Sequence, residues 1–311
     1  MDLSVIIVCY RGWEKLGKCL DSLSTFALEN FSMEVIVVDN NSGDGQIDII
    51  ESRYQKFRVV RNFINGGYGY GCNRGAEIAA GEYILILNPD TIVFENEVQK
   101  LLVNAKLHKE YSAVSCRQVR DDGTECRVAG KFPGLKISNL FPLKPAGNLS
   151  FPDWISGSLM LMPRATFNKL NGFDEDFWMY SEDVDLCKRL RCSGGEIIYY
   201  SDITILHNHG GSSRSDSKTT AITKSEVQIS RHVYLSKHIH GVEGFILHFL
   251  TIADNLITGL LAGITGLVLF FIPKLFVRII ILARLTGYYS GALLRRSWVS
   301  PRSVNSDLHG R

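Results

Sequence analysis

Acidic side chains gather at the start of an expected helix, where proton transfer is the chemistry they can perform. Ser181 can cap this helix, and Glu182 and Asp183 follow it directly. Acidic residues in a first helical turn also occur because they complement the helix dipole, and that alternative stays open. The same dipole holds a carboxylate ionised at neutral pH, as removal of a proton from a hydroxyl group requires. We therefore predict that Asp183 is a general base and that Glu182 shares its catalytic site.

Aromatic side chains precede these acids. Trp178 and Tyr180 can form an apolar platform on which a sugar ring lies. We predict that they bind the acceptor, which is the saccharide whose hydroxyl group loses its proton. Packing in the protein core is the alternative role for at least one of the aromatic residues in this segment.

A second group combines an oxygen ligand with an imidazole. Asn88 and Asp90 lie in a short polar turn after an apolar strand, where a hard divalent cation that bridges diphosphate oxygens needs a carboxylate. His207 ends another strand-like run, and a neutral imidazole at a strand end can ligate the same cation. We predict that Asp90 and His207 hold Mg²⁺ or Mn²⁺. An ordinary strand-ending turn and a structural histidine are the alternatives.

Amide-rich segments could bind a nucleotide. Asp39 and Asn41 directly follow a buried strand, where they can form hydrogen bonds with a nucleoside, although Asx residues often satisfy only their own turn. Residues 62–75 are rich in glycine, so the backbone can approach a diphosphate closely while the amides of Asn65 and Asn73 point at it. This segment does not follow the dinucleotide pattern G-x-G-x-x-G, so it is weak evidence by itself.

The elements that must position these groups are short apolar strands alternating with amphipathic helices. Such alternation indicates a parallel, doubly wound sheet, in which ligands bind beyond the carboxyl ends of the strands. The expected strands are Leu3–Cys9, Met33–Val38, Phe57–Val60, Tyr83–Leu87, Ala113–Ser115 and Trp154–Met162, followed by two further runs that end near His207. The expected helices are Trp13–Phe26, Gln46–Arg53, Cys72–Ala80, Glu95–His108 and one that begins at Ser181. Residues 121–153 are expected to be irregular, either facing a second substrate or forming an ordinary loop.

Bulk properties narrow the functional class. The net charge of +2, without a concentrated excess of Lys and Arg over the first 240 residues, argues against a nucleic-acid partner. Seven cysteines form an odd number without a C-x-x-C pair, as expected for reduced thiols in a cytosolic protein. The N-terminal residues lead directly into a strand-like run and do not form a signal peptide, so we expect the catalytic part to stay in the cytoplasm.

The order of these motifs over residues 3–240 resembles the glycosyltransferases of family 2, which have the GT-A fold, and in particular their rhamnosyltransferase-like branch. The matching segments are Ser4–Tyr10, Val37–Ser42, Asn65–Asn73, Asn88–Thr91, Gly172–Glu175, Tyr180–Leu186 and His207. The resemblance implies a Rossmann-like mixed sheet flanked by helices, and transfer of a sugar with inversion from a nucleotide-diphosphate sugar to an acceptor hydroxyl.

The resemblance also implies roles for individual residues. Tyr10 and Asp39 would lie near the base and ribose of the donor, and Asp183 falls on the aspartate of the family's E-D motif, the usual base. Asp90 takes the place of the last carboxylate of the D-x-D metal motif, and His207 that of a further ligand. Asn88 replaces the first aspartate of D-x-D, which leaves one charge fewer for the cation, and we assign it to donor binding.

The C-terminal residues 242–311 are expected to form a helical segment beside a catalytic domain of residues 1–241. No acidic residue occurs from Asn255 to Ser306, and residues 256–272 form an uncharged apolar run at the short limit for a membrane span. Residues 275–294 contain Arg278 and Arg284, which suits an interfacial amphipathic helix. A single crossing would export the basic tail against the positive-inside tendency. We therefore favour an in-plane or re-entrant hairpin at the cytoplasmic face of the membrane. A true crossing and a buried hairpin in a soluble oligomer are the alternatives.

Membrane attachment favours a lipid-linked saccharide acceptor in surface polysaccharide synthesis over a free saccharide. Two other functions compete with transfer. A sugar-nucleotide pyrophosphorylase would need a basic N-terminal loop, and residues 9–12 offer only Arg11. A non-catalytic sugar-binding or scaffold subunit would not need Asp90, Asp183 and His207 together.

Overall fold

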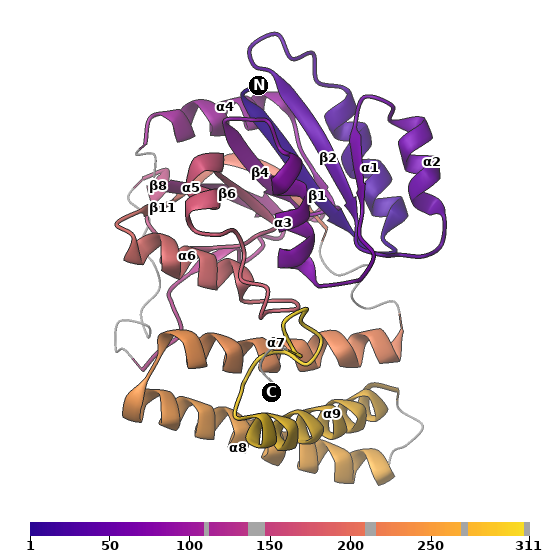
Figure 1. The fold of residues 1–311 in the computed structure, drawn as a ribbon, viewed down its shortest axis with the longest axis vertical. Coiled ribbons are helices and arrows are strands. Elements are labelled where there is room, and N and C mark those ends of the chain that lie inside the picture. The colour runs from indigo at the N-terminus through magenta and orange to yellow at the C-terminus, as the bar shows by residue number, and fades with distance from the viewer. Residues whose placement is uncertain (109–111, 136–146, 209–215, 269–272, 308–311) are drawn as a thin grey trace. The chain divides into compact units, whose positions relative to one another are not determined.

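The computed structural model describes residues 1–108, 112–135, 147–208, 216–268 and 273–307 (Figure 1). These residues divide into two compact units. The sheet unit contains the described parts of residues 1–133, 137–174 and 183–211, and the helical unit contains those of residues 134–136, 175–182 and 212–311. The domain boundary that we placed at residue 241 stays a prediction.

The sheet unit is built on a mixed sheet in the order β3-β2-β1-β4-β10-β6-β11-β5, with β8 pairing with β11. Its strands are β1 (Leu3–Cys9), β2 (Met33–Asp39), β3 (Arg58–Arg61), β4 (Tyr83–Leu87), β5 (Thr91–Ile92), β6 (Ser112–Val119), β8 (Leu149–Ser150), β10 (Leu159–Pro163) and β11 (Glu196–His207). A separate ribbon pairs β7 (Ala129–Gly130) with β9 (Trp154–Ile155). The helices of this unit are α1 (Trp13–Ser24), α2 (Gln46–Arg53), α3 (Tyr68–Ile78), α4 (Glu95–Lys106), α5 (Arg164–Lys169) and α6 (Glu182–Cys192).

The sheet is parallel only in part. Strands β1 to β4 pair in parallel, as do β6 and β11, whereas β10 runs antiparallel to both β4 and β6. The expectation of a wholly parallel sheet from apolar alternation was therefore wrong, and the mixed sheet implied by the family resemblance is confirmed. A strand buried on both faces gives the same continuous apolar run in either direction, so composition could not reveal the reversal.

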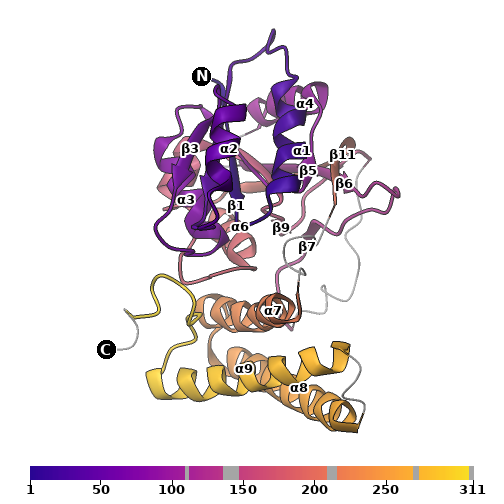
Figure 2. The ribbon, with the colours of Figure 1, turned by 90° about the vertical axis from the view of Figure 1, so that its right-hand side faces the viewer.

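Helices cover both faces of the sheet, which explains why its central strands are apolar throughout. Alternate residues of β1 point to opposite faces: Val5 and Ile7 pack with Leu20 of α1, whereas Ile6 and Val8 pack with Ala76 of α3. Figure 2 shows α1 and α3 on opposite sides of β1. All of β1 is buried. This packing fixes the carboxyl ends of β1, β2 and β4 beside one another, where the predicted ligand-binding residues lie.

Several expected elements have different bounds, and the two expected runs that end near His207 form the single strand β11. Two of the differences affect the candidate site. Helix α3 begins at Tyr68 instead of Cys72, so the glycine-rich segment forms its first turn and is not wholly a loop. The expected strand Trp154–Met162 is interrupted at residues 156–158, which separate β9 from β10. Within residues 121–153, the described parts contain β7 and β8, and residues 136–146 lie outside the described chain.

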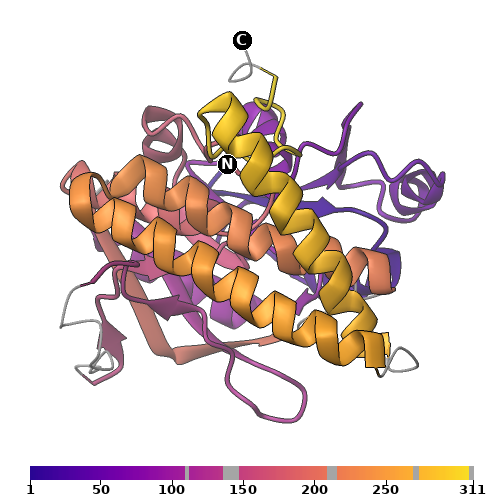
Figure 3. The ribbon, with the colours of Figure 1, turned by 90° about the horizontal axis from the view of Figure 1, so that it is seen from below.

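The helical unit consists mainly of α7 (Ser217–His238), α8 (Gly241–Val268) and α9 (Pro273–Arg295). Figure 3 shows α7 and α8 running alongside each other while α9 crosses them. The buried His232 of α7 stacks on His248 and Trp298, with 2.7 Å between the two Nδ1 atoms. Burial lowers the pKa of His232 to about 3, so this ring is neutral at physiological pH.

Within the described part of the helical unit, two helices are long and apolar enough to cross a membrane, over Gly241–Thr265 and Val277–Arg295. In the most apolar 18-residue stretch of each helix, only 11% and 22%, respectively, is buried. Apolar side chains are exposed along α8, at Val242, Phe245, Ile246, Phe249, Leu250, Leu256, Ile257, Leu260, Leu261 and Ile264. We call these residues the apolar face of α8. Most of the expected run 256–272 belongs to this helix, and residues 269–272 lie outside the described chain.

Candidate active site

The residues predicted to bind the nucleoside lie where β1 and β2 end. The buried Asp39 accepts a hydrogen bond at Oδ1 from the backbone N–H of Ser42 (3.0 Å), so one carboxylate oxygen closes the strand-end turn. Asn41 lies in this turn with φ +63° and an exposed side chain. Tyr10 follows β1 with 43% of its surface exposed. Contact of these side chains with a donor stays a prediction.

The amides of Asn65 and Asn73 form hydrogen bonds within the protein. Asn65 Oδ1 accepts from Asn40 Nδ2 (3.0 Å) and from the N–H of Gly67 (3.2 Å). Asn73 Nδ2 donates to the carbonyl of Phe173 (2.8 Å), and its Oδ1 accepts from the N–H of the same residue (2.9 Å). These two amides therefore hold the glycine-rich segment and the turn at Phe173, and their contact with a donor stays a prediction.

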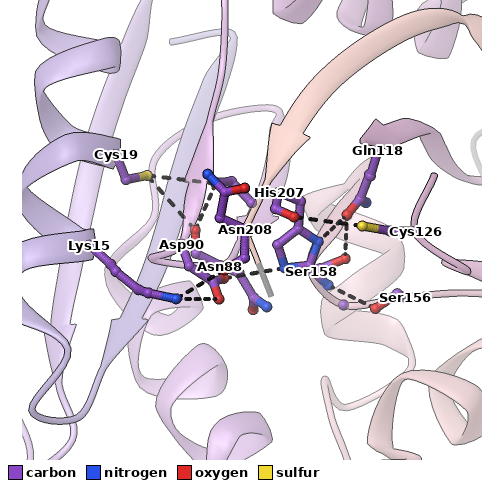
Figure 4. Close-up of polar contacts among 12 residues, drawn as sticks. Lys15, Cys19, Asn88, Asp90, Gln118, Cys126, Ser156, Ser158, His207 and Asn208 are labelled. Carbon is purple, nitrogen blue, oxygen red and sulfur yellow. Dashed lines mark hydrogen bonds and ion pairs between the residues drawn. The ribbon is translucent and has the colours of Figure 1, made fainter. Parts of the chain in front are cut away.

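The structure brings Asp90 and His207 together (Figure 4). The distance between Asp90 Oδ1 and His207 Nε2 is 3.3 Å, and Lys15 Nζ lies 3.6 Å from Asp90 Oδ2. Lys15 also donates to the carbonyl of Asn208 (2.9 Å), and the N–H of Asn208 donates to the carbonyl of Asp90 (3.0 Å). His207 is completely buried, whereas the Asp90 side chain is 12% exposed. One carboxylate therefore lies between an ammonium group and an imidazole.

Asp183 lies in the first turn of α6 with both carboxylate oxygens engaged. Oδ2 accepts from the N–H of Gly157 (3.0 Å), and Oδ1 accepts from the N–H of Val184 (2.8 Å). Burial raises the pKa of the Asp183 carboxyl group, and these backbone N–H groups oppose the rise. The sequence suggested that the dipole of α6 keeps Asp183 ionised, but burial has the larger effect on the pKa of this carboxyl group. A raised pKa makes this carboxylate a stronger base.

The backbone before Asp183 is strained. Tyr180 and Ser181 both adopt positive φ angles, +72° and +64°, which L-residues rarely take. Residues held in such conformations cost on the order of 1–3 kcal/mol each and tend to occur at functional sites. Ser181 precedes α6 as expected from the sequence, but with this left-handed backbone.

The segment 156–158 connects the predicted base with the Asp90–His207 pair. Gly157 donates to Asp183, whereas the carbonyl of Ser158 accepts from the N–H of Asn88 (2.9 Å). Ser158 Oγ also donates to Gln118 Oε1 (2.9 Å), and this oxygen lies 2.6 Å from His207 Nδ1. The three groups on which the prediction of transfer depended therefore lie around one short segment between β9 and β10.

The remaining predicted site residues belong to the helical unit. Glu182 is buried, with 5% of its surface exposed. Trp178 is equally buried, and the Arg302 guanidinium lies 4.0 Å from the centre of its ring, as the core-packing alternative expects. Tyr180 is partly buried. Catalysis by Glu182 and acceptor binding by Trp178 and Tyr180 stay predictions.

The donor atoms at Asp90 suit a divalent cation. Among the described residues, no group of three or more His, Cys, Asp or Glu side chains is placed to hold a metal. Asp90 and His207 offer one oxygen and one nitrogen ligand 3.3 Å apart, and Mg²⁺ in nucleotide sites commonly uses one or two protein ligands with substrate phosphates and water. The pair therefore fits a cation that is bound together with a diphosphate.

Sequence reasoning missed Lys15, Gln118 and Ser158. Lys15 lies on α1, far from Asp90 along the chain, and Gln118 reaches His207 across 89 residues. Both side chains belong to regular elements and have no motif around them. The position of α1 brings Lys15 to the site, and the pairing of β6 with β11 brings Gln118 there.

Residues 4–185 match the family model described as "Glycosyl transferase family 2". The chain belongs to this family, and it is a glycosyltransferase with a GT-A fold.

Its relatives place it in the rhamnosyltransferase-like branch. The chain is 30% identical over 243 residues to the N-acetylglucosaminyl-diphospho-decaprenol L-rhamnosyltransferase of Mycobacterium tuberculosis strain H37Rv, covering 69% of this chain and 78% of the relative. It is 26% identical over 225 residues to the rhamnosyltransferase WbbL of Escherichia coli K12, covering 65% and 82%.

A solved structure shares the fold. The mannosyltransferase PcManGT from Pyrobaculum calidifontis, in complex with GDP-Man and Mn²⁺, matches with a TM-score of 0.55 at 16% identity, covering 99% of this chain and 83% of that protein. Other solved chains of this fold are longer, and the chain spans 40% to 70% of their length.

Proposed function

We propose that the chain transfers a deoxyhexose such as rhamnose, with inversion, from a nucleotide-diphosphate sugar to a lipid-linked saccharide at the cytoplasmic face of the membrane. The observation that carries this proposal is the arrangement of Asp90, His207 and Asp183 around segment 156–158. The substrate class is taken from the relative named as acting on N-acetylglucosaminyl-diphospho-decaprenol and from the second rhamnosyltransferase.

In the proposed reaction, Asp183 accepts the proton of an acceptor hydroxyl whose oxygen forms a bond to the anomeric carbon. The bond between that carbon and the diphosphate breaks on the opposite face, and its electron pair leaves on the diphosphate oxygen. Asp90 and His207 would hold Mg²⁺ or Mn²⁺, and the bound cation would supply positive charge that stabilises the leaving diphosphate. The PcManGT structure, solved with Mn²⁺ and GDP-Man, supports this cation. Lys15 adds a permanent positive charge beside Asp90.

The substrate proposal is tested with the full chain in lipid vesicles. We expect transfer from a nucleotide-linked rhamnose to polyprenyl-diphospho-N-acetylglucosamine and much slower transfer to free N-acetylglucosamine, measured by mass spectrometry across a panel of nucleotide sugars with and without Mn²⁺. An inverted anomeric configuration in the product, determined by NMR, is the expected stereochemistry. Efficient transfer to the free sugar with none to the lipid would contradict the proposed acceptor.

The membrane proposal rests on the apolar face of α8. Because Phe249 and Leu260 are about 60% exposed, their replacement should not disturb the fold, and each would lose about 1.5–3 kcal/mol of burial in lipid. We expect Phe249→Asp and Leu260→Asp each to weaken co-sedimentation with anionic vesicles by about tenfold or more. The matched control is Val103→Asp on α4, which is 52% exposed. Equal binding by all three variants would exclude this face as the membrane contact.

A further inference from the structure

Gln118 is a buried amide of β6 that contacts His207 and that no sequence motif marks. Its side chain is fully buried, and its Oε1 receives a hydrogen bond from Ser158 Oγ (2.9 Å) while lying 2.6 Å from His207 Nδ1 (Figure 4). The side-chain nitrogen of Gln118 has no hydrogen-bond partner among the described residues. The oxygen of this amide therefore contacts both Ser158 and His207, while its nitrogen forms no hydrogen bond with the described residues.

This contact determines which ring nitrogen of His207 carries the proton. An amide oxygen only accepts hydrogen bonds, so Nδ1 of His207 must be the donor at 2.6 Å. In a neutral ring, the proton on Nδ1 leaves Nε2 with its lone pair, and Nε2 faces Asp90 Oδ1 at 3.3 Å. The lone pair and the carboxylate oxygen then point to a common position, as two ligands of one cation do.

The opposite orientation of the amide would have the opposite effect. If the Gln118 nitrogen faced His207, Nδ1 would have to accept, and the proton would move to Nε2. That proton could then be donated to Asp90, and neither atom would be open to a cation. In the observed orientation, the hydroxyl of Ser158 donates to the same Gln118 oxygen that accepts from His207.

We propose that Gln118 is a positioning residue that keeps His207 protonated on Nδ1, so that Nε2 can bind a divalent cation together with Asp90. The inference rests on the proposed metal role of Asp90 and His207. Partners of metal-bound histidines act in this way, and their removal typically weakens metal affinity about 10–100-fold. Because segment 156–158 also holds Asp183 through Gly157, the same backbone orients the cation ligand and the base.

The test compares Gln118→Met with Gln118→Glu. Methionine has a similar length but offers only a weak acceptor, and it also removes the buried nitrogen that has no partner, so this variant is expected to fold. Glutamate keeps an oxygen that accepts from Nδ1 and serves as the conservative variant. The ring nitrogens of His207 are observed by NMR in protein labelled with ¹⁵N-histidine. Mn²⁺ affinity is measured by electron paramagnetic resonance in the presence of inorganic pyrophosphate, which supplies the diphosphate oxygens.

We expect His207 to carry its proton on Nδ1 in the unmodified protein and in Gln118→Glu, and on Nε2 in Gln118→Met. Mn²⁺ affinity should fall about 10–100-fold in Gln118→Met and be restored by glutamate. If methionine prevents folding, Gln118→Leu supplies the same comparison, because it also removes the oxygen that accepts from Nδ1. An Nδ1 proton that persists in Gln118→Met or Gln118→Leu would overturn the inference. If neither the unmodified protein nor any variant binds Mn²⁺ while the proton shifts as expected, the metal role would be excluded from the proposed function and the role of Gln118 would stand.

Discussion

Replacing Asp183 with Asn is expected to abolish sugar transfer while leaving binding of the sugar nucleotide close to that of the unmodified protein. The introduced side-chain amide would keep one oxygen to accept a backbone hydrogen bond but could not take the proton of the acceptor hydroxyl. General-base catalysis contributes typically about 10²–10⁴-fold, so the rate should fall by at least that range. Transfer is measured with saturating donor and acceptor, and donor binding is measured by calorimetry.

The control for this variant is Asp202→Asn, which removes an exposed carboxylate of β11 away from the site. It should keep normal transfer. The pH profile gives a second test: because a base must be ionised, transfer should decrease as pH falls through the Asp183 pKa, which burial places above the ordinary value. Near-normal turnover by Asp183→Asn would exclude Asp183 as the base.

Replacing Asp90 with Asn is expected to reduce transfer about 10²–10³-fold, the loss typical when one group that stabilises transition-state charge is removed. Asp90 is a carboxylate that contacts both His207 and Lys15, and Asn88 already lacks a charge. Without Asp90, His207 would be the remaining protein ligand of the pair. Donor binding should then lose its dependence on Mn²⁺, measured by calorimetry with Mn²⁺ and with a chelator.

Lys15 determines how much donor binding should remain in the Asp90→Asn variant. Its ammonium group lies 3.6 Å from Asp90 Oδ2, and in the Asp90→Asn variant it would be released to pair with the donor's diphosphate. Weak donor binding that does not depend on a metal is therefore expected to remain. Asp202→Asn again controls for loss of a negative charge. Unchanged Mn²⁺-dependent transfer by Asp90→Asn would exclude Asp90 as a cation ligand.

The sequence predicted the elements whose signals are local. Strands such as β1 and β4 consist of apolar residues that both faces of a covered sheet require, and helices such as α1 repeat apolar residues every three or four positions. The reversal of β10 and the break at residues 156–158 were not predictable in this way. Strand direction depends on pairing, and the break exists because its backbone donates to Asp183 and accepts from Asn88.

The same distinction applies to the site. Asp90 and His207 were predicted because each ends a strand or follows one with a chemically suitable side chain, and the structure places them 3.3 Å apart. Lys15 and Gln118 gave no signal, since a lysine on a surface helix and a glutamine near a strand end are ordinary in composition. Asn73 shows where a sequence pattern reaches its limit, because a buried amide that pairs with the backbone of Phe173 has the same sequence appearance as one that faces a ligand. Its contact with a donor stays a prediction.

The distribution of thiols offers a practical route to observing the site. Six cysteines are buried and Cys192, at the end of α6, is exposed. Burial raises the pKa of thiols such as Cys9 and Cys19 to about 12, so they react slowly with electrophiles at neutral pH. A maleimide dye should therefore label the protein at Cys192 alone. With a helical rise of about 1.5 Å per residue, the dye would be attached about 14 Å along the helix from Asp183 and could report fluorescence changes as substrates bind.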